Sequence, residues 1–317
     1  MEVSLNVKRF DPESNAQGPH FQEYNLDVEE YFTVLDALIK VREEMDGSLA
    51  LRCSCRASIC GSCSMRVNGH AKLVCKTKVR DVVNHDHRVT VEPMNNLPVV
   101  KDLVTDMEPF WDKVRAIQPW LQPYGTVPEK EYIAPNETML HLAGVMSCIM
   151  CGACVSDCTA LEVDKNFIGP AALAKAYRFV GDPRDDAGID RLRMYGQSGG
   201  IWDCTRCMEC VQVCPKGVAP MERIMGLRDK AIEAGLSNNN GARHTEAFSE
   251  LVKHSGRLDE LRLPIKTFGI FNFPALIGLL PVGLRALRKG KMPPIIHKSI
   301  PGVERVRRIF EKVESKK

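Results

Sequence analysis

The sequence contains no uninterrupted run of about eighteen or more apolar residues, the length that a membrane-spanning helix needs. We therefore expect no membrane span. The chain begins directly with an alternating pattern, Met1-Glu2-Val3-Ser4, and has no twin arginine nearby, so we also expect no targeting segment. A net charge of +3 over 317 residues is too small to indicate binding to nucleic acid. No G-x-G-x-x-G motif follows a candidate strand, which argues against a dinucleotide-binding turn.

Cysteine, by contrast, is abundant, with thirteen residues in the chain. Without a secretory start, so many cysteines indicate metal binding in a reducing compartment rather than a disulfide framework. Hydrophobic residues make up 44% of the chain and charged residues 26%, which is typical of a globular protein. At this length we expect two domains, each large enough to bury its own core.

Eight cysteines form two runs with the same spacing, C-x2-C-x2-C-x3-C, and Pro215 follows the second run. In bacterial ferredoxins with this spacing, three cysteines of one run hold a [4Fe–4S] cluster and the fourth reaches across to the other cluster. Zinc explains the pattern less well, because a structural zinc site needs only four ligands, usually two C-x2-C pairs. The spacing predicts one cluster held by Cys148, Cys151, Cys154 and Cys214, and another held by Cys204, Cys207, Cys210 and Cys158.

A different spacing, C-x4-C-x2-C with a distant fourth cysteine, lies nearer the N-terminus and is typical of plant-type [2Fe–2S] ferredoxins. Gly61 inside this loop lets the backbone approach the sulfides of a cluster closely. Asn68-Gly69 predicts a tight hairpin turn that carries the chain back to the fourth cysteine. We interpret the remaining Cys53 as a small buried side chain without a ligand role. The predicted ligands are Cys55, Cys60, Cys63 and Cys75.

The hydrophobic pattern predicts an α+β protein. Alternation in residues 3–9 and 21–28 predicts a hairpin, and Thr33 with Asp36 predicts the start of a helix that runs to about residue 45. Beyond a proline-rich stretch the pattern is helical, with helices expected over 170–180 and 221–234. We expect three segments: a β-grasp, plant-type [2Fe–2S] ferredoxin domain (1–106), an α-helical, bacterial-type two-cluster ferredoxin domain (107–250) and a C-terminal extension (251–317).

The order of these blocks resembles the iron–sulfur subunits of succinate dehydrogenase and fumarate reductase, the succinate:quinone oxidoreductase family. The resemblance covers roughly residues 1–235. The segment Leu97-Pro98-Val99-Val100-Lys101-Asp102-Leu103-Val104-Thr105-Asp106 resembles the inter-domain segment of the family. Phe167-Ile168-Gly169-Pro170, followed by Ala176-Tyr177-Arg178-Phe179, resembles its segment between the cysteine runs.

The resemblance implies an electron relay. Electrons from an FAD-containing flavoprotein subunit would enter the [2Fe–2S] cluster, pass the [4Fe–4S] cluster and a third cluster, and reach quinone at membrane anchor subunits; fumarate reduction runs the other way. It also implies a peripheral position on the cytoplasmic side of a membrane. The chain shows no acid–base pair or nucleophile, so we expect no catalytic residues here. Scattered histidines such as His70, His141 and His244 are interpreted as structural.

The chain departs from the resemblance at the third cluster. Better-known members of the family have no cysteine at the position of Cys207 and carry a [3Fe–4S] centre. A fourth thiolate favours [4Fe–4S], and a [3Fe–4S] centre with a non-binding Cys207 is the alternative. Thr159 and Thr205 replace a proline and a histidine that the family uses at its quinone site, and residues 161–164 contain no tryptophan. We therefore do not carry the quinone site over to this chain.

The extension is the other departure. Residues 268–284 are uncharged and apolar, but Pro274 and Pro281 interrupt them. A basic cluster (Arg285, Arg288, Lys289, Lys291) follows, and residues 303–313 predict an amphipathic helix. The segment suits a membrane interface, while docking on the protein's own surface or on a partner remains an alternative. The alternative functions are an iron–sulfur subunit of a thiol-dependent fumarate reductase or heterodisulfide-reductase-like complex, and a freestanding ferredoxin.

Overall fold

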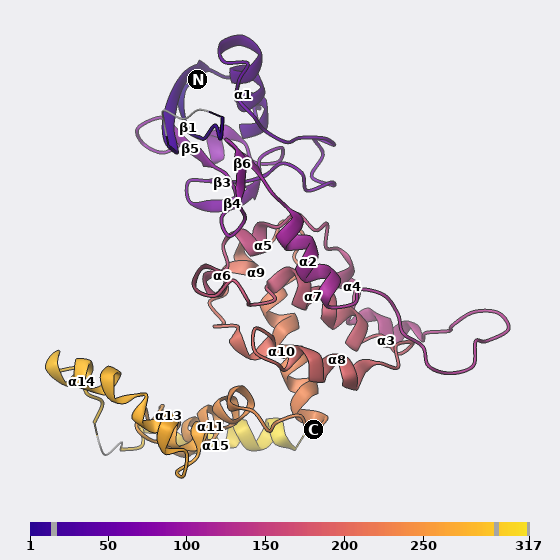
Figure 1. Cartoon of the computed structure of the whole chain (residues 1–317), viewed down its shortest axis with the longest axis vertical. Coiled ribbons are helices and arrows are strands. Elements are labelled where there is room, and N and C mark those ends of the chain that lie inside the picture. Colours follow the sequence, from indigo (N-terminus) through magenta and orange to yellow (C-terminus); the bar gives the residue numbers. More distant parts are fainter. Residues whose placement is uncertain (14–17, 295–297, 316–317) are drawn as a thin grey trace. The chain divides into compact units, whose positions relative to one another are not determined.

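The computed structural model describes residues 1–13, 18–294 and 298–315. The chain divides into two compact units, residues 1–230 and residues 231–317. Each unit is described by itself (Figure 1). The proposed boundaries near residues 106 and 250 stay predictions.

The first unit begins with a five-stranded sheet in the order β2-β1-β5-β3-β4. The predicted hairpin is confirmed, because β1 (Glu2–Arg9) pairs antiparallel with β2 (His20–Asp27). Alternate residues of β1, namely Val3, Leu5 and Val7, are buried. The last strand, β5 (Arg88–Glu92), runs parallel to β1 and antiparallel to β3 (Ser64–Val67). The predicted turn at Asn68-Gly69 joins β3 to β4 (His70–Leu73) (Figure 1).

One helix packs its apolar side against this sheet, which completes a β-grasp arrangement. Helix α1 (Val34–Lys40) begins with a capping box in which Thr33 and Asp36 cap each other's backbone N–H groups, as the sequence predicted. The helix continues as a wider, π-helical turn over Val41–Met45. Leu35 and Leu38 join the strand residues in one hydrophobic core, so burial of this face holds the helix on the sheet.

A buried carboxylate fastens the end of the sheet region. Asp102 lies in the turn between β6 (Val99–Lys101) and β7 (Val104–Thr105) and is 1% exposed. Its Oδ1 accepts hydrogen bonds from Arg9 Nε at 2.9 Å and from the backbone N–H of Phe10 at 3.0 Å. Its Oδ2 accepts one from the N–H of Ala50 at 2.9 Å, just ahead of the loop that carries Cys55, Cys60 and Cys63. The carboxylate is therefore fully hydrogen-bonded, as a buried charge must be.

The rest of the first unit is helical, as predicted. Helix α7 occupies Pro170–Val180 as expected, and Pro220–Glu233 forms α10 where 221–234 was predicted. The sequence did not indicate α8. The helices are α2 (Glu108–Ala116), α3 (Asn136–Leu140), α4 (Ala143–Met146), α5 (Ala153–Ser156), α6 (Thr159–Val163), α7, α8 (Gly188–Tyr195), α9 (Glu209–Gln212) and α10. Short helical turns also occur at Val79–Asp81 and Ile201–Asp203.

The second unit is made of short helices: α11 (Asn240–Ser255), α12 (Arg262–Phe268), α13 (Phe273–Ile277), α14 (Leu280–Arg288) and α15 (Val303–Glu314). Helix α11 packs against α12 and α15. Pro274 and Pro281, expected only to interrupt an apolar stretch, stand in the first turns of α13 and α14, where proline starts a helix well. In the described part of the chain, no helix is long and apolar enough to cross a membrane.

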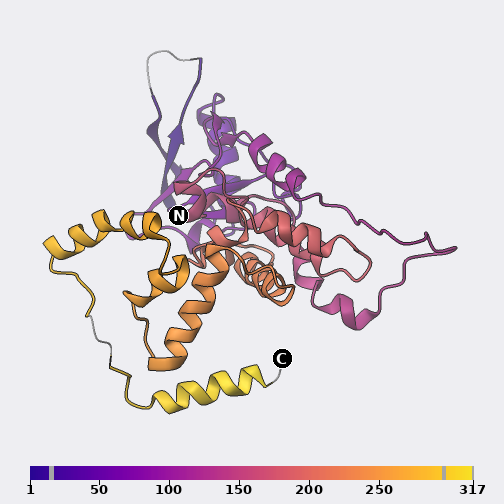
Figure 2. The ribbon, with the colours of Figure 1, turned by 60° about the horizontal axis from the view of Figure 1, so that its bottom comes forward.

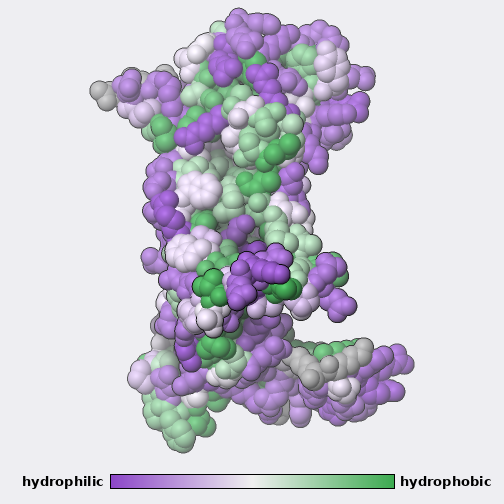
Figure 3. All heavy atoms as spheres, turned by 90° about the vertical axis from the view of Figure 1, so that its right-hand side faces the viewer, coloured by the Kyte–Doolittle hydropathy of each residue, from purple (hydrophilic) through white to green (hydrophobic). Residues whose placement is uncertain are grey.

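Hydrophobic side chains reach the surface in several places among hydrophilic ones on the face drawn in Figure 3. In the second unit, the large exposed ones concentrate between residues 270 and 287.

Candidate functional site

Four cysteines from both runs line one pocket: Cys148, Cys151, Cys154 and Cys214. The first three lie around the start of α5, where Gly152 adopts a left-handed conformation (φ +79°) that favours glycine. Cys214 follows α9 in the chain, and its Sγ accepts a hydrogen bond from the N–H of Val218 at 3.4 Å. Contact between α5 and α9 thus brings the two runs together.

Burial shapes the acidity of this set. It raises the pKa of Cys151 to about 11 and holds the pKa of Cys154 well above its usual value, and the neighbouring thiols add to both effects. Such thiols release their protons only when a cation takes their place. The donor set and its pocket therefore fit a positively charged iron–sulfur core.

A second set joins the fourth cysteine of the first run to three of the second run. Burial raises the pKa of Cys210 to about 12, and Cys204, Cys158 and Cys207 lie near enough to raise it further. Burial likewise raises the pKa of Cys158, and Cys207 and Cys204 contribute again. The four sulfurs thus lie within electrostatic range of one another. Their assignment to one cluster stays a prediction.

The third set lies in the loop before β3. The Sγ of Cys55 accepts three hydrogen bonds, from the N–H groups of Ala57 (3.4 Å), Ile59 (3.3 Å) and Cys60 (3.3 Å). The Ser62 hydroxyl, 3.1 Å from the Cys60 Sγ, lowers the pKa of Cys60 to about 6, with help from nearby backbone amides. Deeper in the loop, burial raises the pKa of Cys63 to about 12, and Cys75 lies beside it. These N–H groups point at sulfur and can stabilise bound anionic sulfur.

Among the described residues, no three His, Cys, Asp or Glu side chains converge as ligands of a single metal ion would. Ligands of one zinc ion lie about 2.3 Å from it, whereas the thiolates of a multi-iron cluster surround a larger body. Cys53 belongs to none of the three sets and packs partly buried against the core of the sheet.

The loop of the third set touches the first cysteine run. A Cβ built on Gly61 would lie 2.8 Å from Cys151 Cβ and 2.9 Å from Cys151 Cα, so only glycine fits. Polar contacts hold the same junction: Asp157 Oδ2 accepts a hydrogen bond from the Ala71 N–H at 2.9 Å. The Asn96 side chain donates to the carbonyls of Val155, Ser156 and Cys158. Two ligand loops far apart in the sequence are thus in van der Waals contact.

Comparison with known proteins adds two domain matches. Residues 4–112 match a 2Fe-2S iron-sulfur cluster binding domain, and residues 144–218 match a 4Fe-4S dicluster domain. The 8-methylmenaquinol:fumarate reductase iron-sulfur subunit of Wolinella succinogenes is 33% identical over 297 residues, which cover 91% of this chain and 90% of that protein. The chain belongs to the family of succinate dehydrogenase and fumarate reductase iron–sulfur subunits. The resemblance inferred from the cysteine blocks is therefore confirmed.

Other members of the family match over a shorter stretch. The fumarate reductase iron-sulfur subunit of Mycobacterium tuberculosis is 37% identical over 69% of this chain and 88% of its own length. The succinate dehydrogenase iron-sulfur subunit of Paracoccus denitrificans is 35% identical over 72% of this chain and 88% of its own length. The solved Mycobacterium smegmatis Sdh1 complex in the apo form contains a chain with a TM-score of 0.68 and 27% identity, covering 75% of this chain and 98% of that one. The predicted fold class, a [2Fe–2S] domain followed by a helical two-cluster domain, is confirmed.

In this iron–sulfur subunit, Cys207 lies in an unusual environment. Burial alone would raise its pKa, but hydrogen bonds from the hydroxyls of Thr159 and Thr205 and from the N–H groups of Glu209 and Thr159 outweigh that effect and lower it. The side chain is exposed, unlike Cys158 and Cys210 of the same set. The two threonines that replace the family's quinone-site residues thus both lower the pKa of one thiol.

Arg228, which sequence reasoning did not single out, holds the loop before this set. It is 5% exposed and donates to the carbonyls of Ile201 (2.8 Å), Trp202 (3.0 Å) and Cys204 (2.8 Å). Its guanidinium lies 5.5 Å from the centre of the Trp202 ring, so a cation–π contact adds to these hydrogen bonds. Burial lowers the pKa of Arg228 to about 10. In the sequence, Arg228 looks like any arginine of a surface helix.

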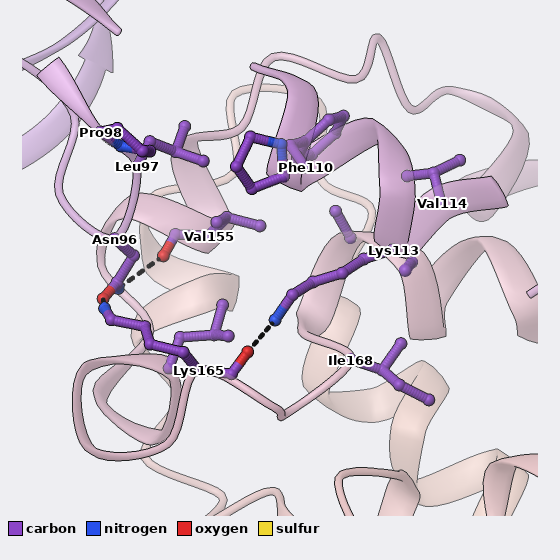
Figure 4. Close-up of a pocket in the computed structure, with 13 residues that line it drawn as sticks. Asn96, Leu97, Pro98, Phe110, Lys113, Val114, Val155, Lys165 and Ile168 are labelled. Carbon is purple, nitrogen blue, oxygen red and sulfur yellow. Dashed lines mark hydrogen bonds between the residues drawn. The ribbon is translucent and has the colours of Figure 1, made fainter. Parts of the chain in front are cut away.

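A separate apolar pocket of about 460 Å³ lies between residues 96–98, α2 and the segment that joins α6 to α7. The Lys113 ammonium donates to the Lys165 carbonyl at 2.6 Å, and the Lys165 ammonium donates to Asn96 Oδ1 at 2.6 Å (Figure 4). Both charges are therefore engaged by the walls of the pocket. No cysteine lines it, so the pocket is distinct from the three thiol sets.

The contact at Gly61 generates a prediction. Changing Gly61→Ala forces the loop away from Cys151 and strains a residue at φ +74°. We expect loss of [2Fe–2S] content or a slower reoxidation of that cluster, with the signal of the [4Fe–4S] cluster retained. The measurement is EPR of the dithionite-reduced protein together with rapid-freeze reoxidation.

Gly69→Ala is the matched control, since Gly69 has φ +84° but its Cβ would meet only the end of the Arg66 side chain, at 4.0 Å. If Gly69→Ala and Gly61→Ala behave alike, backbone strain and not the inter-loop contact explains the effect.

Proposed function

We propose that this chain is the electron-transfer subunit of a succinate dehydrogenase or fumarate reductase complex. It would relay electrons between the FAD site of a flavoprotein subunit and quinone at membrane anchor subunits, from a peripheral position on the cytoplasmic side of the membrane. The observation that carries the proposal is the contact between the loops of two thiol sets inside one compact unit. Electron tunnelling falls steeply with distance, so a relay needs such contact.

The ligands assigned to each cluster follow the three thiol sets. Cys55, Cys60, Cys63 and Cys75 would hold [2Fe–2S], and Cys148, Cys151, Cys154 and Cys214 would hold [4Fe–4S]. Cys158, Cys204, Cys207 and Cys210 would hold the third cluster. When bound, such clusters accept and release single electrons. The protein contributes the dry pocket, the N–H groups aimed at sulfur and the fixed spacing between sets.

For the third cluster we propose [4Fe–4S] rather than [3Fe–4S]. The proposal is supported by the position of Cys207 within electrostatic range of Cys158 and Cys210. It is also supported by the hydrogen bonds from Thr159 and Thr205, which favour the thiolate form that binds iron. Sulfur that accepts several hydrogen bonds is stabilised as an anion.

The extent of the matches favours one direction of electron flow. The relative named as an 8-methylmenaquinol:fumarate reductase subunit matches 91% of this chain, so the match extends well into residues 231–317. The relatives from Mycobacterium tuberculosis and Paracoccus denitrificans match only 69% and 72% of this chain. We therefore propose fumarate reduction with electrons from a quinol as the more specific candidate.

The test is isolation of the native complex. We expect the chain to co-purify anaerobically with an FAD-containing subunit that interconverts succinate and fumarate. Cys154→Ser should stop quinol-driven fumarate reduction, while the flavoprotein still reduces fumarate with a small artificial donor. Isolation with a partner that lacks activity on both acids would overturn the proposal.

A second prediction concerns Cys207. Replacing Cys207→Ser should change the third cluster alone, because only that set includes this sulfur. We expect either a loss of iron or a new signal of a three-iron centre in EPR of the oxidised protein. Cys53→Ser is the control and should leave all three clusters unchanged. Equal iron content and identical spectra for Cys207→Ser would refute the ligand assignment.

The two threonines generate a third prediction. The double change Thr159→Val and Thr205→Val removes hydroxyl donors from the Cys207 sulfur and so destabilises the more negative, reduced cluster. We expect the reduction potential of the third cluster to fall by roughly 60 mV, which corresponds to about 1.4 kcal/mol for one electron. The measurement is an EPR-monitored redox titration.

Thr245→Val is the control for this titration, since the Thr245 hydroxyl donates only to the Gly241 carbonyl in α11. An unchanged potential in the double variant would show that these hydroxyls do not act on the cluster.

A further inference from the structure

The second unit contains a segment with charge of only one sign. Residues 261–303 include no Asp or Glu, although the chain as a whole has 40 acidic residues. The same stretch contains seven basic residues, which exceeds the net charge of +3 of the entire chain: Arg262, Lys266, Arg285, Arg288, Lys289, Lys291 and Lys298. Arg262 and Lys266 form ion pairs with Asp259 and Glu250, so the positive charge that attracts an anionic surface comes mainly from the residues at the end of α14.

Large apolar side chains lie exposed within the same segment. Phe271 is 85% exposed and Phe273 is 62% exposed. On α14, Leu280, Leu284 and Leu287 recur at helical spacing, so they share one face, and all three are more than half exposed. A contiguous apolar surface of this kind marks a site of interaction rather than ordinary protein surface.

The geometry of α13 and α14 suits the surface of a bilayer and not its interior. The nine residues of α14 span about 14 Å, less than half of the hydrocarbon thickness. In both Figure 1 and Figure 2, α14 extends away from α11 and α15 of its own unit. Among the described residues, no carboxylate pairs with Arg285, Arg288, Lys289 or Lys291. Both the leucine face and the basic cluster therefore remain free for a partner.

We propose that residues 270–291 form an interfacial segment that binds directly to a bilayer of anionic lipid. The phenylalanines and the leucine face of α14 would enter the boundary between headgroups and acyl chains. The basic cluster at the end of α14 would lie against the anionic headgroups. This inference goes beyond the electron relay and does not depend on it.

The charge pattern favours lipid over a protein partner. Protein interfaces have a polar rim around a core that is depleted of charged residues. Helix α15 of the same unit carries charges of both signs, with Glu304, Arg308 and Glu311 beside the exposed Ile309 and Val313. The segment 270–291 lacks acidic residues altogether, so a phospholipid surface with negative headgroups complements its basic end, and the acyl boundary complements its uncharged, apolar part.

The test uses the full chain, purified anaerobically with its clusters and without other subunits. Co-sedimentation is measured with vesicles of phosphatidylcholine alone and with vesicles of equal parts phosphatidylcholine and phosphatidylglycerol. We expect binding to the anionic vesicles only, weakened by salt. Changing the four basic residues at the end of α14 to Gln should lower binding about fivefold for each charge removed. Leu284→Ser with Leu287→Ser should also lower it at least tenfold.

The matched control is Ile309→Ser with Val313→Ser, which removes two exposed apolar side chains of α15 and should leave binding unchanged. Cluster absorption and circular dichroism verify that each variant is folded. Three outcomes would overturn the proposal: no binding to either vesicle, equal binding to both, or equal losses in the α14 and α15 variants. Loss of co-purification with another subunit in the α14 variants, without vesicle binding by the parent chain, would assign the surface to a protein. None of these outcomes changes the cluster signals on which the relay depends.

Discussion

The contact between Gly61 and Cys151 is the constraint on which the first unit depends. A relay requires two redox centres to approach closely, and each centre is held by its own loop from a different part of the chain. The missing side chain at Gly61 permits this approach, and the Asp157 carboxylate fixes it by binding the Ala71 N–H. The sheet and the helices therefore serve mainly to hold these two cysteine loops in contact.

Burial varies along the relay in a way that fits this role. Cys55 and Cys60 are exposed in their loop, and Cys207 is exposed in the set of the third cluster. The four cysteines that line one pocket, Cys148, Cys151, Cys154 and Cys214, are all partly buried. Exposed cysteines in the second and third sets bring these sites near the protein surface, where electrons can enter and leave by contact with partner subunits.

How far the sequence predicts this site depends on whether a signal is local. The cysteine spacings are local, so they indicate the three sets, and the alternation in β1 and the capping box at Thr33 indicate the sheet and its helix. Asn96 and Arg228 are not predictable in this way, because each binds backbone carbonyls that are remote in the sequence. Short helices such as α12 and α13 also escape prediction. They are too short to show a repeating hydrophobic pattern, and single residues determine where they begin.

The departures from the family are connected and are not independent losses. Thr159 and Thr205 stand where the resemblance places quinone-binding residues, and both hydroxyls help to lower the pKa of Cys207. A proline and a histidine at these positions would remove the Thr159 N–H and both hydroxyls from that sulfur, because proline has no N–H to donate. The differences at Thr159, Thr205 and Cys207 therefore concern one place in the fold, because both threonines act on the same thiol.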